Sequence, residues 1–343
     1  MWPVLQVLGG LAILAALLWR LGTGAFVEGL RVIDAGAVVA ALGIGLLTTV
    51  FSAWRWCLVA RRVGLPLRLG TAVADYYRSL FLNATLPGGV LGDVHRGVRH
   101  GQHADDLGRG VRAVVLERTA GQVVVFAAAA AVLLSQPSWL HEIVAPSYVP
   151  VAVGLFAAVV AFIAWARSSA RGRQAVATVV TEIRGVLARD TWPGIAILSA
   201  ATLLGHLALF LVSARVAGVS APVSQLVPLM VLALLAMGLP VNVGGWGPRE
   251  GVTAWAFGAA GLGATHGLTV AVVYGVLAFV ASLPGAGVLL LRRGRPQVEL
   301  EKRVGAEGNS PHRRPQRISH PFGAPEVQAG HAVAQQHRRD GDV

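Results

Sequence analysis

Two segments of the sequence place ionisable residues beside prolines and glycines. The first covers residues 83–96 and reads NATLPGGVLGDVHR, and the second covers residues 239–251 and reads LPVNVGGWGPREG. Proline and glycine clusters stop a helix in mid-course, and the broken end leaves backbone N–H groups free to bind an anion. An arginine beside such a break can pair with a phosphate through its planar guanidinium. Both segments are therefore candidate sites for an anionic head group.

The first break supplies most of the candidate binding residues. Arg96 would hold the anion, while Asp93 would either orient that arginine or carry a proton. The alternative is a cytoplasmic turn in which this charged pair only lies at the interface. We predict a substrate-binding role for these residues of the first break: Asn83, Pro87, Gly88, Gly89, Gly92, Asp93 and Arg96.

The second break contains the only strongly charged residues between Val216 and Leu291. An ionisable pair within a long apolar region is costly, and we therefore predict that Arg249 and Glu250 are functional. The alternative is a pair that lies at the outer membrane interface. The predicted substrate-binding residues of the second break are Asn242, Gly244, Gly247, Arg249 and Glu250.

Three further charged residues lie within or beside apolar runs. Glu117 and Arg118 stand near the start of such a run, and if they face the bundle interior they close a charge network with Asp93 and Arg96. If they face outward, they extend to the cytoplasmic interface instead. Arg55 lies between two tryptophans, and we predict that it is an interface anchor.

The sequence contains none of the common catalytic or metal-binding motifs. There is no nucleophile elbow, no His-Glu-x-x-His and no phosphate loop, and Cys57 is the single cysteine. The histidines near the carboxyl end are irregularly spaced, which is typical of solvated residues. We therefore predict that the protein is not an enzyme and that it uses no cofactor and no metal.

The composition indicates an apolar solvent around much of the protein. Of the 343 residues, 55% are hydrophobic and only 13% are charged, and the mean hydropathy is +0.62. Soluble domains contain about 25% charged residues, so this chain has too few to cover its surface in water. The net charge is +12, but the arginines fall between long apolar runs. That pattern is typical of a membrane protein and predicts no nucleic-acid partner.

Six apolar runs each approach the length of about 20 residues that an α-helix needs to cross a bilayer. Arginine-rich segments alternate with arginine-free connections, and a cytoplasmic amino terminus places every arginine-rich segment inside. We therefore predict a multi-pass protein of a bacterial-type plasma membrane, with both termini cytoplasmic. The predicted spans are residues 2–18, 35–60, 113–134, 147–166, 192–214 and 268–291.

The two breaks lie in stretches whose halves are too short for comfortable spans. We predict that residues 70–94 and 226–262 form re-entrant hairpins, although two thin full spans in each place would preserve the same orientation. The predicted fold is an all-α polytopic bundle over residues 1–293, followed by a disordered cytoplasmic tail over residues 294–343.

The bundle divides into halves, residues 1–146 and 147–293, that share one order of elements. Each half crosses the membrane an odd number of times, so the second is inverted relative to the first. Pro87 precedes Arg96 by nine residues, and Pro240 precedes Arg249 by nine. Inverted repeats with matched broken helices indicate a transporter site.

Four motifs in order resemble the transmembrane region of lysylphosphatidylglycerol synthases. They are LPGGVLGDVHR at 86–96, LER at 116–118, LPVNVGGWGPREG at 239–251 and LPGAG at 283–287. The same region occurs in stand-alone, flippase-like integral membrane proteins, and the resemblance covers roughly residues 1–292. It implies a membrane protein that moves or binds a lipid. It does not imply synthase activity, because the residues after the last span are too few and too polar for the soluble synthase domain.

These observations favour a flippase that moves an anionic or aminoacylated phospholipid, or another lipid-linked molecule, across the plasma membrane. One alternative is an intramembrane transferase with Asp93 or Glu250 as its catalytic carboxylate. Another is a scaffold for a lipid-modifying enzyme. The predicted partners are the cargo lipid and a lipid-synthesis enzyme encoded separately, and the sequence leaves a homo-oligomer open.

Overall fold

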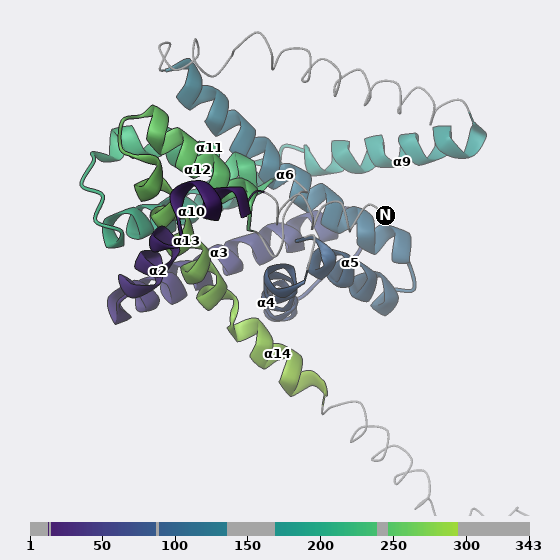
Figure 1. Cartoon of the computed structure of the whole chain (residues 1–343). Helices are drawn as coiled ribbons and strands as arrows, with labels where there is room; N and C mark the ends of the chain where they lie inside the picture. The colour runs from purple at the N-terminus through teal and green to yellow at the C-terminus, as the bar shows by residue number, and fades with distance from the viewer. Residues whose placement is uncertain (1–12, 14, 87–88, 136–168, 239–245, 294–343) are drawn as a thin grey trace, which may run out of the picture. The chain divides into compact units, whose positions relative to one another are not determined.

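The computed structural model describes residues 13, 15–86, 89–135, 169–238 and 246–293. The chain divides into two units, Met1–Gly294 and Arg295–Val343, and the described residues all belong to the first. Within them no strand occurs, and the unit is built from helices (Figure 1). The helices are α2 (Gly24–Arg31), α3 (Ala35–Arg62), α4 (Leu69–Thr85), α5 (Leu91–His103), α6 (Leu107–Leu134), α9 (Ala170–Val186), α10 (Trp192–Val216), α11 (Val223–Met237), α12 (Pro248–Ala259), α13 (Ala264–Ser282) and α14 (Pro284–Arg293).

Among the described residues, four helical segments are long and apolar enough to cross a membrane. They are Ala35–Arg62, Leu107–Val132, Trp192–Val216 and Ala264–Leu291, and they coincide with four of the predicted spans. The first predicted span lies mostly outside the described residues, and the fourth lies entirely outside them. The prediction of an all-α membrane protein is confirmed, whereas the six spans and the inversion of the second half stay predictions.

Each predicted break separates two short helices. Residues 86–90 separate α4 from α5, and Leu86 has the extended backbone (φ −98°, ψ 147°) that is favoured before a proline. Residues 238–247 separate α11 from α12. Gly247 begins α12 with a φ of 115°, which glycine adopts without the usual steric penalty, and Pro248 follows in the first helical turn, where its missing N–H costs nothing.

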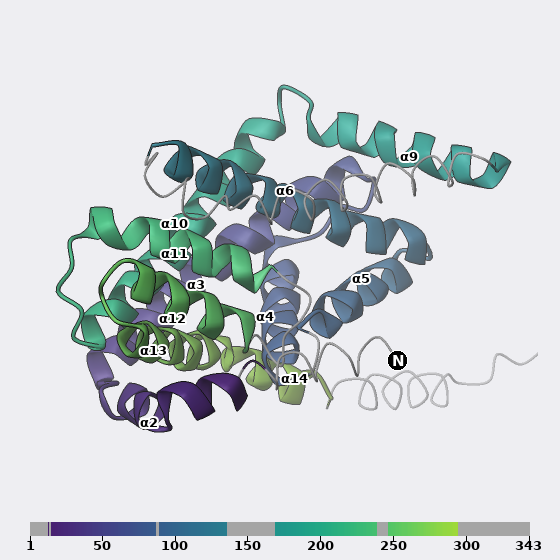
Figure 2. The same ribbon diagram turned by 45° about the horizontal axis from the view of Figure 1, so that its top comes forward.

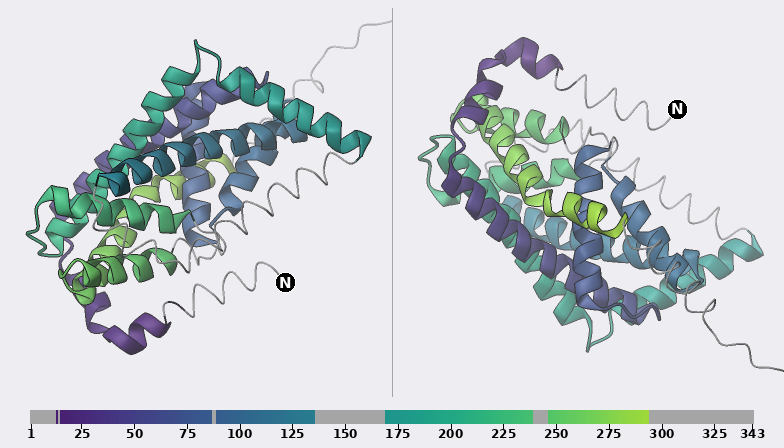
Figure 3. Two further views of the ribbon diagram at one scale, coloured as in Figure 1. Left: turned by 90° about the horizontal axis from the view of Figure 1, so that it is seen from above. Right: turned by 90° about the horizontal axis from the view of Figure 1, so that it is seen from below.

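The order and packing of the helices repeat along the chain. The series α3–α4–α5–α6 has 28, 17, 13 and 28 residues, and α10–α11–α12–α13 has 25, 15, 12 and 19. Neighbours within each series pack together, and the two series meet through α3 and α10, which run side by side (Figure 3). Contacts between the series are also matched, because α4 packs on α13 as α11 packs on α6 (Figure 2).

The largest apolar cluster lies where α3, α10, α11, α12 and α13 meet. The side chains of Phe210, Leu226 and Phe257 are completely buried there. By contrast, the outer faces of the long helices expose large apolar side chains, among them Val39, Phe126 and Leu204, each at least 60% exposed. Such faces suit contact with lipid, so close packing and the buried polar contacts, not exclusion from water alone, hold the helices together.

Gly45 marks a close approach between α3 and α13, and we expect Gly45→Ala to destabilise the fold. A Cβ at residue 45 would lie 2.5 Å from the Cβ of Ala281, well inside the usual contact distance of about 3.5–4.0 Å. Overpacking of this kind costs about 1–3 kcal/mol. A thermal unfolding experiment on the detergent-solubilised protein should therefore give a lower Tm.

The control is Gly43→Ala on the same helix. A Cβ at residue 43 would meet nothing within 4 Å, and alanine favours a helix over glycine by about 1 kcal/mol. Its Tm should match or exceed that of the parent protein. Equal losses in the two variants would contradict the packing of α3 on α13.

Candidate functional site

Asp93 connects the two helices on either side of the first break. It lies in the first turn of α5, where the free N–H groups of the helix favour a negative charge. Ser79 and Asn83, both on α4, donate hydrogen bonds to its carboxylate at 3.0 and 2.9 Å, and the backbone N–H of Gly92 donates to the Asn83 side chain at 2.7 Å. A Cβ on Gly92 would collide with the carbonyl oxygen of Ser79, so this approach of α5 to α4 requires glycine.

Arg96 lies one turn further along α5 and is 1% exposed. Its Nη2 donates to Asp93 Oδ1 at 3.0 Å and to Glu117 Oε2 at 2.9 Å. The guanidinium carbon lies 4.5 Å from the ring centroid of Trp56 and 4.2 Å from that of Tyr76. Two aromatic faces and two carboxylates therefore stabilise this buried charge.

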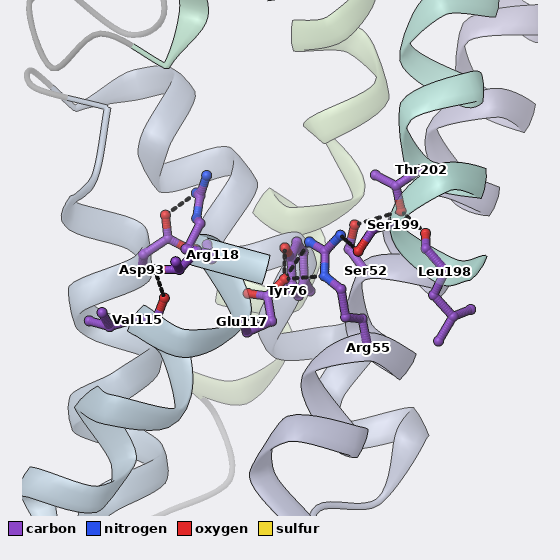
Figure 4. Close-up of polar contacts among 12 residues, drawn as sticks. Ser52, Arg55, Tyr76, Asp93, Val115, Glu117, Arg118, Leu198, Ser199 and Thr202 are labelled. Atoms are coloured by element: carbon purple, nitrogen blue, oxygen red, sulfur yellow. Dashed lines mark hydrogen bonds and ion pairs between the residues drawn. The ribbon is translucent and has the colours of Figure 1, made fainter. Parts of the chain in front are cut away.

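Glu117 is completely buried on α6 and lies at the centre of the polar contacts (Figure 4). Its Oε1 accepts hydrogen bonds from Nε and Nη2 of Arg55 at 2.9 and 2.5 Å, and from the hydroxyl of Tyr76 at 3.2 Å. The remaining guanidinium nitrogen of Arg55, Nη1, donates to the hydroxyl of Ser199 on α10 at 3.1 Å. Side chains from α3, α4 and α5 thus donate to one carboxylate on α6, and Arg55 connects this group to α10.

Arg118 forms the exposed edge of this group. Its guanidinium pairs with Asp93 Oδ2, while 48% of its side chain is exposed. We call the five residues that these ion pairs connect the arginine–carboxylate network: Arg55, Asp93, Arg96, Glu117 and Arg118. With three arginines and two carboxylates, the network carries one surplus positive charge.

Unpaired polar atoms gather beside the network. Within the described part of the chain, the buried side-chain atoms without a hydrogen-bond partner are Trp56 Nε1, Arg96 Nε, Arg96 Nη1 and His100 Nε2. They are neighbours, because Arg96 stacks on Trp56 and the rings of Trp56 and His100 lie 5.3 Å apart at an interplanar angle of 68°. Indole and guanidinium nitrogens only donate, so the surroundings of Arg96 have more donors than acceptors.

The second break forms a smaller buried pair. Arg249 and Glu250 are 3% and 0% exposed, and Arg249 Nε donates to Glu250 Oε1 at 2.9 Å. The other carboxylate oxygen accepts from the backbone N–H of Gly247 at 2.6 Å. The guanidinium lies 5.2 Å from the ring centroids of both Trp246 and Tyr274. This pair is therefore inside the helix packing and is not exposed at its surface.

The structure brings together the predicted site residues of the first break and the α6 pair. A chain of hydrogen bonds and ion pairs joins Asn83, Gly92, Asp93, Arg96, Glu117 and Arg118, and Gly89 lies just before α5 with a φ of 62°. Gly247, Arg249 and Glu250 form a second cluster, and no ion pair between described residues joins it to the network. Four predicted site residues lie outside the described residues: Pro87, Gly88, Asn242 and Gly244.

The prediction for Arg55 is wrong. It is not an interface anchor, because it is 5% exposed and bound to Glu117. The available signal was a charge that interrupts the apolar run of α3, which indicates a buried functional group more strongly than an anchor. No comparable signal marks Tyr76 or Ser199, because tyrosine and serine are common in membrane helices.

Removing the charge of Glu117 should destabilise the protein strongly. Glu117→Gln leaves Arg55 and Arg96 buried with too little negative charge, and loss of one partner of a buried ion pair costs about 3–5 kcal/mol. Thermal unfolding measures the loss. The same substitution at exposed Glu28 on α2 is the matched control and should leave Tm nearly unchanged.

A double variant tests whether the loss comes from uncompensated charge. Adding Arg55→Gln to Glu117→Gln removes one of the stranded cations, so the double variant should be more stable than the sum of the single losses indicates. Strictly additive losses would show that Arg55 and Glu117 are not coupled.

Comparison with known proteins places the chain in a family. Searches of curated proteins and of solved structures find no match. A family model described as the lysylphosphatidylglycerol synthase TM region matches residues 6–285. The match includes both breaks, the arginine–carboxylate network and the Arg249–Glu250 pair. This chain is therefore a membrane protein that belongs to the family of the lysylphosphatidylglycerol synthase TM region.

Proposed function

We propose that the protein is a lipid transporter that moves an anionic or aminoacylated phospholipid, or another lipid-linked molecule, across the membrane. Its family indicates a membrane function related to lipids. The observation that carries the proposal is the surplus positive charge of the arginine–carboxylate network, which lies beside a broken helix and reaches the surface at Arg118.

The contacts of Asp93 explain how an anionic head group could bind at little cost. Asp93 accepts hydrogen bonds from Ser79, Asn83 and Arg96 in addition to Arg118. When a phosphate binds Arg118 in place of Asp93, the Asp93 carboxylate still accepts from three donors, and Arg96 still neutralises its charge. The arginine exchanges one oxygen anion for another, so no buried charge is left unpaired at any stage.

The buried part of the network would then act as a rigid support. Arg96 and Arg55 hold Glu117 from two sides, and this fixes the position of Arg118 on the next residue of α6. A preorganised cation binds an anion more tightly than a mobile one, because less side-chain freedom is lost on binding.

The remaining parts of the proposal concern the setting. The protein would lie in a bacterial-type plasma membrane with both termini in the cytoplasm, because this orientation puts the arginine-rich segments inside. It would act without chemistry of its own, on a lipid supplied by a separately encoded synthesis enzyme, as a single chain or a homo-oligomer.

A lipid-translocation assay in vesicles tests the proposal. We expect the parent protein to carry fluorescent phosphatidylglycerol between leaflets, and Arg118→Gln to slow this movement by about tenfold or more, because a hydrogen bond to a charged group is worth about 1.5–3 kcal/mol. Bleaching of outer-leaflet lipid with dithionite measures the rate. The control is Arg109→Gln on the same helix, whose arginine pairs with Asp106 away from the network.

Equal rates for Arg118→Gln and the parent protein would overturn the proposed site. Mass spectrometry of the lipid after the assay separates transport from catalysis: an altered lipid mass would favour the transferase, and unchanged lipid on the opposite leaflet favours transport. If Arg249→Gln and Glu250→Gln leave translocation intact while Arg118→Gln abolishes it, the second break has no part in carrying lipid.

A further inference from the structure

Helix α9 has two chemically different faces. Val176, Val179, Val180 and Ile183 recur at the spacing of a single helix face, and Leu187 continues it one turn later. Much of the rest of the helix surface is polar, with Thr178, Thr181 and Glu182 away from the apolar stripe. At 17 residues, with charges along its length, α9 is not among the segments that are long and apolar enough to cross a membrane.

The apolar face of α9 is partly exposed. Val179, Val180 and Ile183 are 37%, 38% and 39% exposed, and Leu187 is 63% exposed. The helix packs on α3 and contacts α6 through the Glu182–Arg112 pair, and its amino-terminal part projects away from the other described helices (Figures 1 and 3). An apolar stripe of this kind in water is unfavourable, so it needs a partner.

Two groups of polar contacts fix the position of α9 along the axes of α3 and α6, and so its depth relative to the membrane. Glu182 accepts hydrogen bonds from Arg112 Nε at 2.9 and 3.0 Å, and Arg112 lies in the second turn of α6. Just after α9, Thr191 accepts from Nε of Arg62, the last residue of α3, and Asp190 pairs with the same arginine. Both contacts are at arginine-rich ends of membrane-crossing helices, which lie at the boundary between lipid and water.

The charges of α9 and of the residues just after it indicate which kind of surface the apolar stripe would contact. Hydrogen bonding from Arg62 lowers the pKa of Asp190, and Glu182 is held by Arg112, so both acids are neutralised within the protein. Arg184 and Arg189 are exposed. The segment therefore presents positive charge beside its apolar stripe, which complements an anionic bilayer surface.

We propose that α9 is an interfacial helix that lies in the membrane surface, in the leaflet at the arginine-rich ends of α3 and α6. Its apolar face enters the acyl-chain region, and Arg184, at the edge of that face, and Arg189, just after the helix, bind anionic head groups. The contacts through Arg62 and Arg112 connect it to α3 and α6, the helices that carry Arg55 and Glu117. The inference is independent of lipid transport, since it concerns a different surface.

Spin labels at single cysteines test the position of α9 in the full chain. In a Cys57→Ala background reconstituted in phosphatidylcholine with phosphatidylglycerol, nitroxides at Val180→Cys and Ile183→Cys should be accessible to oxygen and protected from a water-soluble nickel chelate. Nitroxides at Thr178→Cys and Thr181→Cys, on the polar face, should show the reverse, with a several-fold difference in the accessibility ratio.

Three results would overturn the proposal. If all four positions are equally accessible to the nickel chelate, α9 lies in water. If positions 180 and 183 are protected from both reagents, protein covers the stripe, whether a second copy or another part of the chain. If the depth at position 183 is unaffected both by omission of phosphatidylglycerol and by Arg184→Gln with Arg189→Gln, the helix does not bind anionic lipid.

Discussion

The packing of the helices around α6 depends on one interaction, the binding of the buried Glu117 carboxylate by its hydrogen-bond donors. This carboxylate has no exposed surface, and it accepts hydrogen bonds from Arg55 on α3, Arg96 on α5 and Tyr76 on α4. Without these donors the loss of its hydration would cost several kcal/mol, so three helices must place polar groups within reach of α6. Apolar packing tolerates many arrangements of helices in lipid, whereas this set of directional contacts is satisfied by few.

The break between α4 and α5 makes those contacts geometrically accessible. In one continuous helix, residues 83 and 93 would lie about 15 Å apart along the axis. With the helix interrupted, Asn83 donates to Asp93 at 2.9 Å, and Arg96 turns back toward Glu117. The second break solves the same problem locally, because Gly247 turns the chain so that its own N–H reaches Glu250. Interrupted helices thus allow charges to be paired inside an apolar bundle.

Much of the fold could be predicted because membrane helices are specified by local composition. Long apolar runs and the proline–glycine clusters marked α3, α6, α10 and the two breaks without knowledge of any contact. The arginine–carboxylate network was harder to predict from the sequence. Glu117 and Arg118 are adjacent in sequence, yet Glu117 is buried and 48% of the Arg118 side chain is exposed. Neighbouring residues point 100° apart on a helix, so which one faces the interior depends on where other helices pack.

The sequence by itself determined that this protein lies in a membrane, that it is helical and where its helices are interrupted, because each of these follows from residue type and local spacing. Tertiary structure decided which charges are paired. It placed Arg55, 62 residues from Glu117 in the chain, against that carboxylate, and it left Arg249 and Glu250 paired with each other. Charge pairing depends on distances of a few ångströms between separate helices, and such distances are set only when the helices pack.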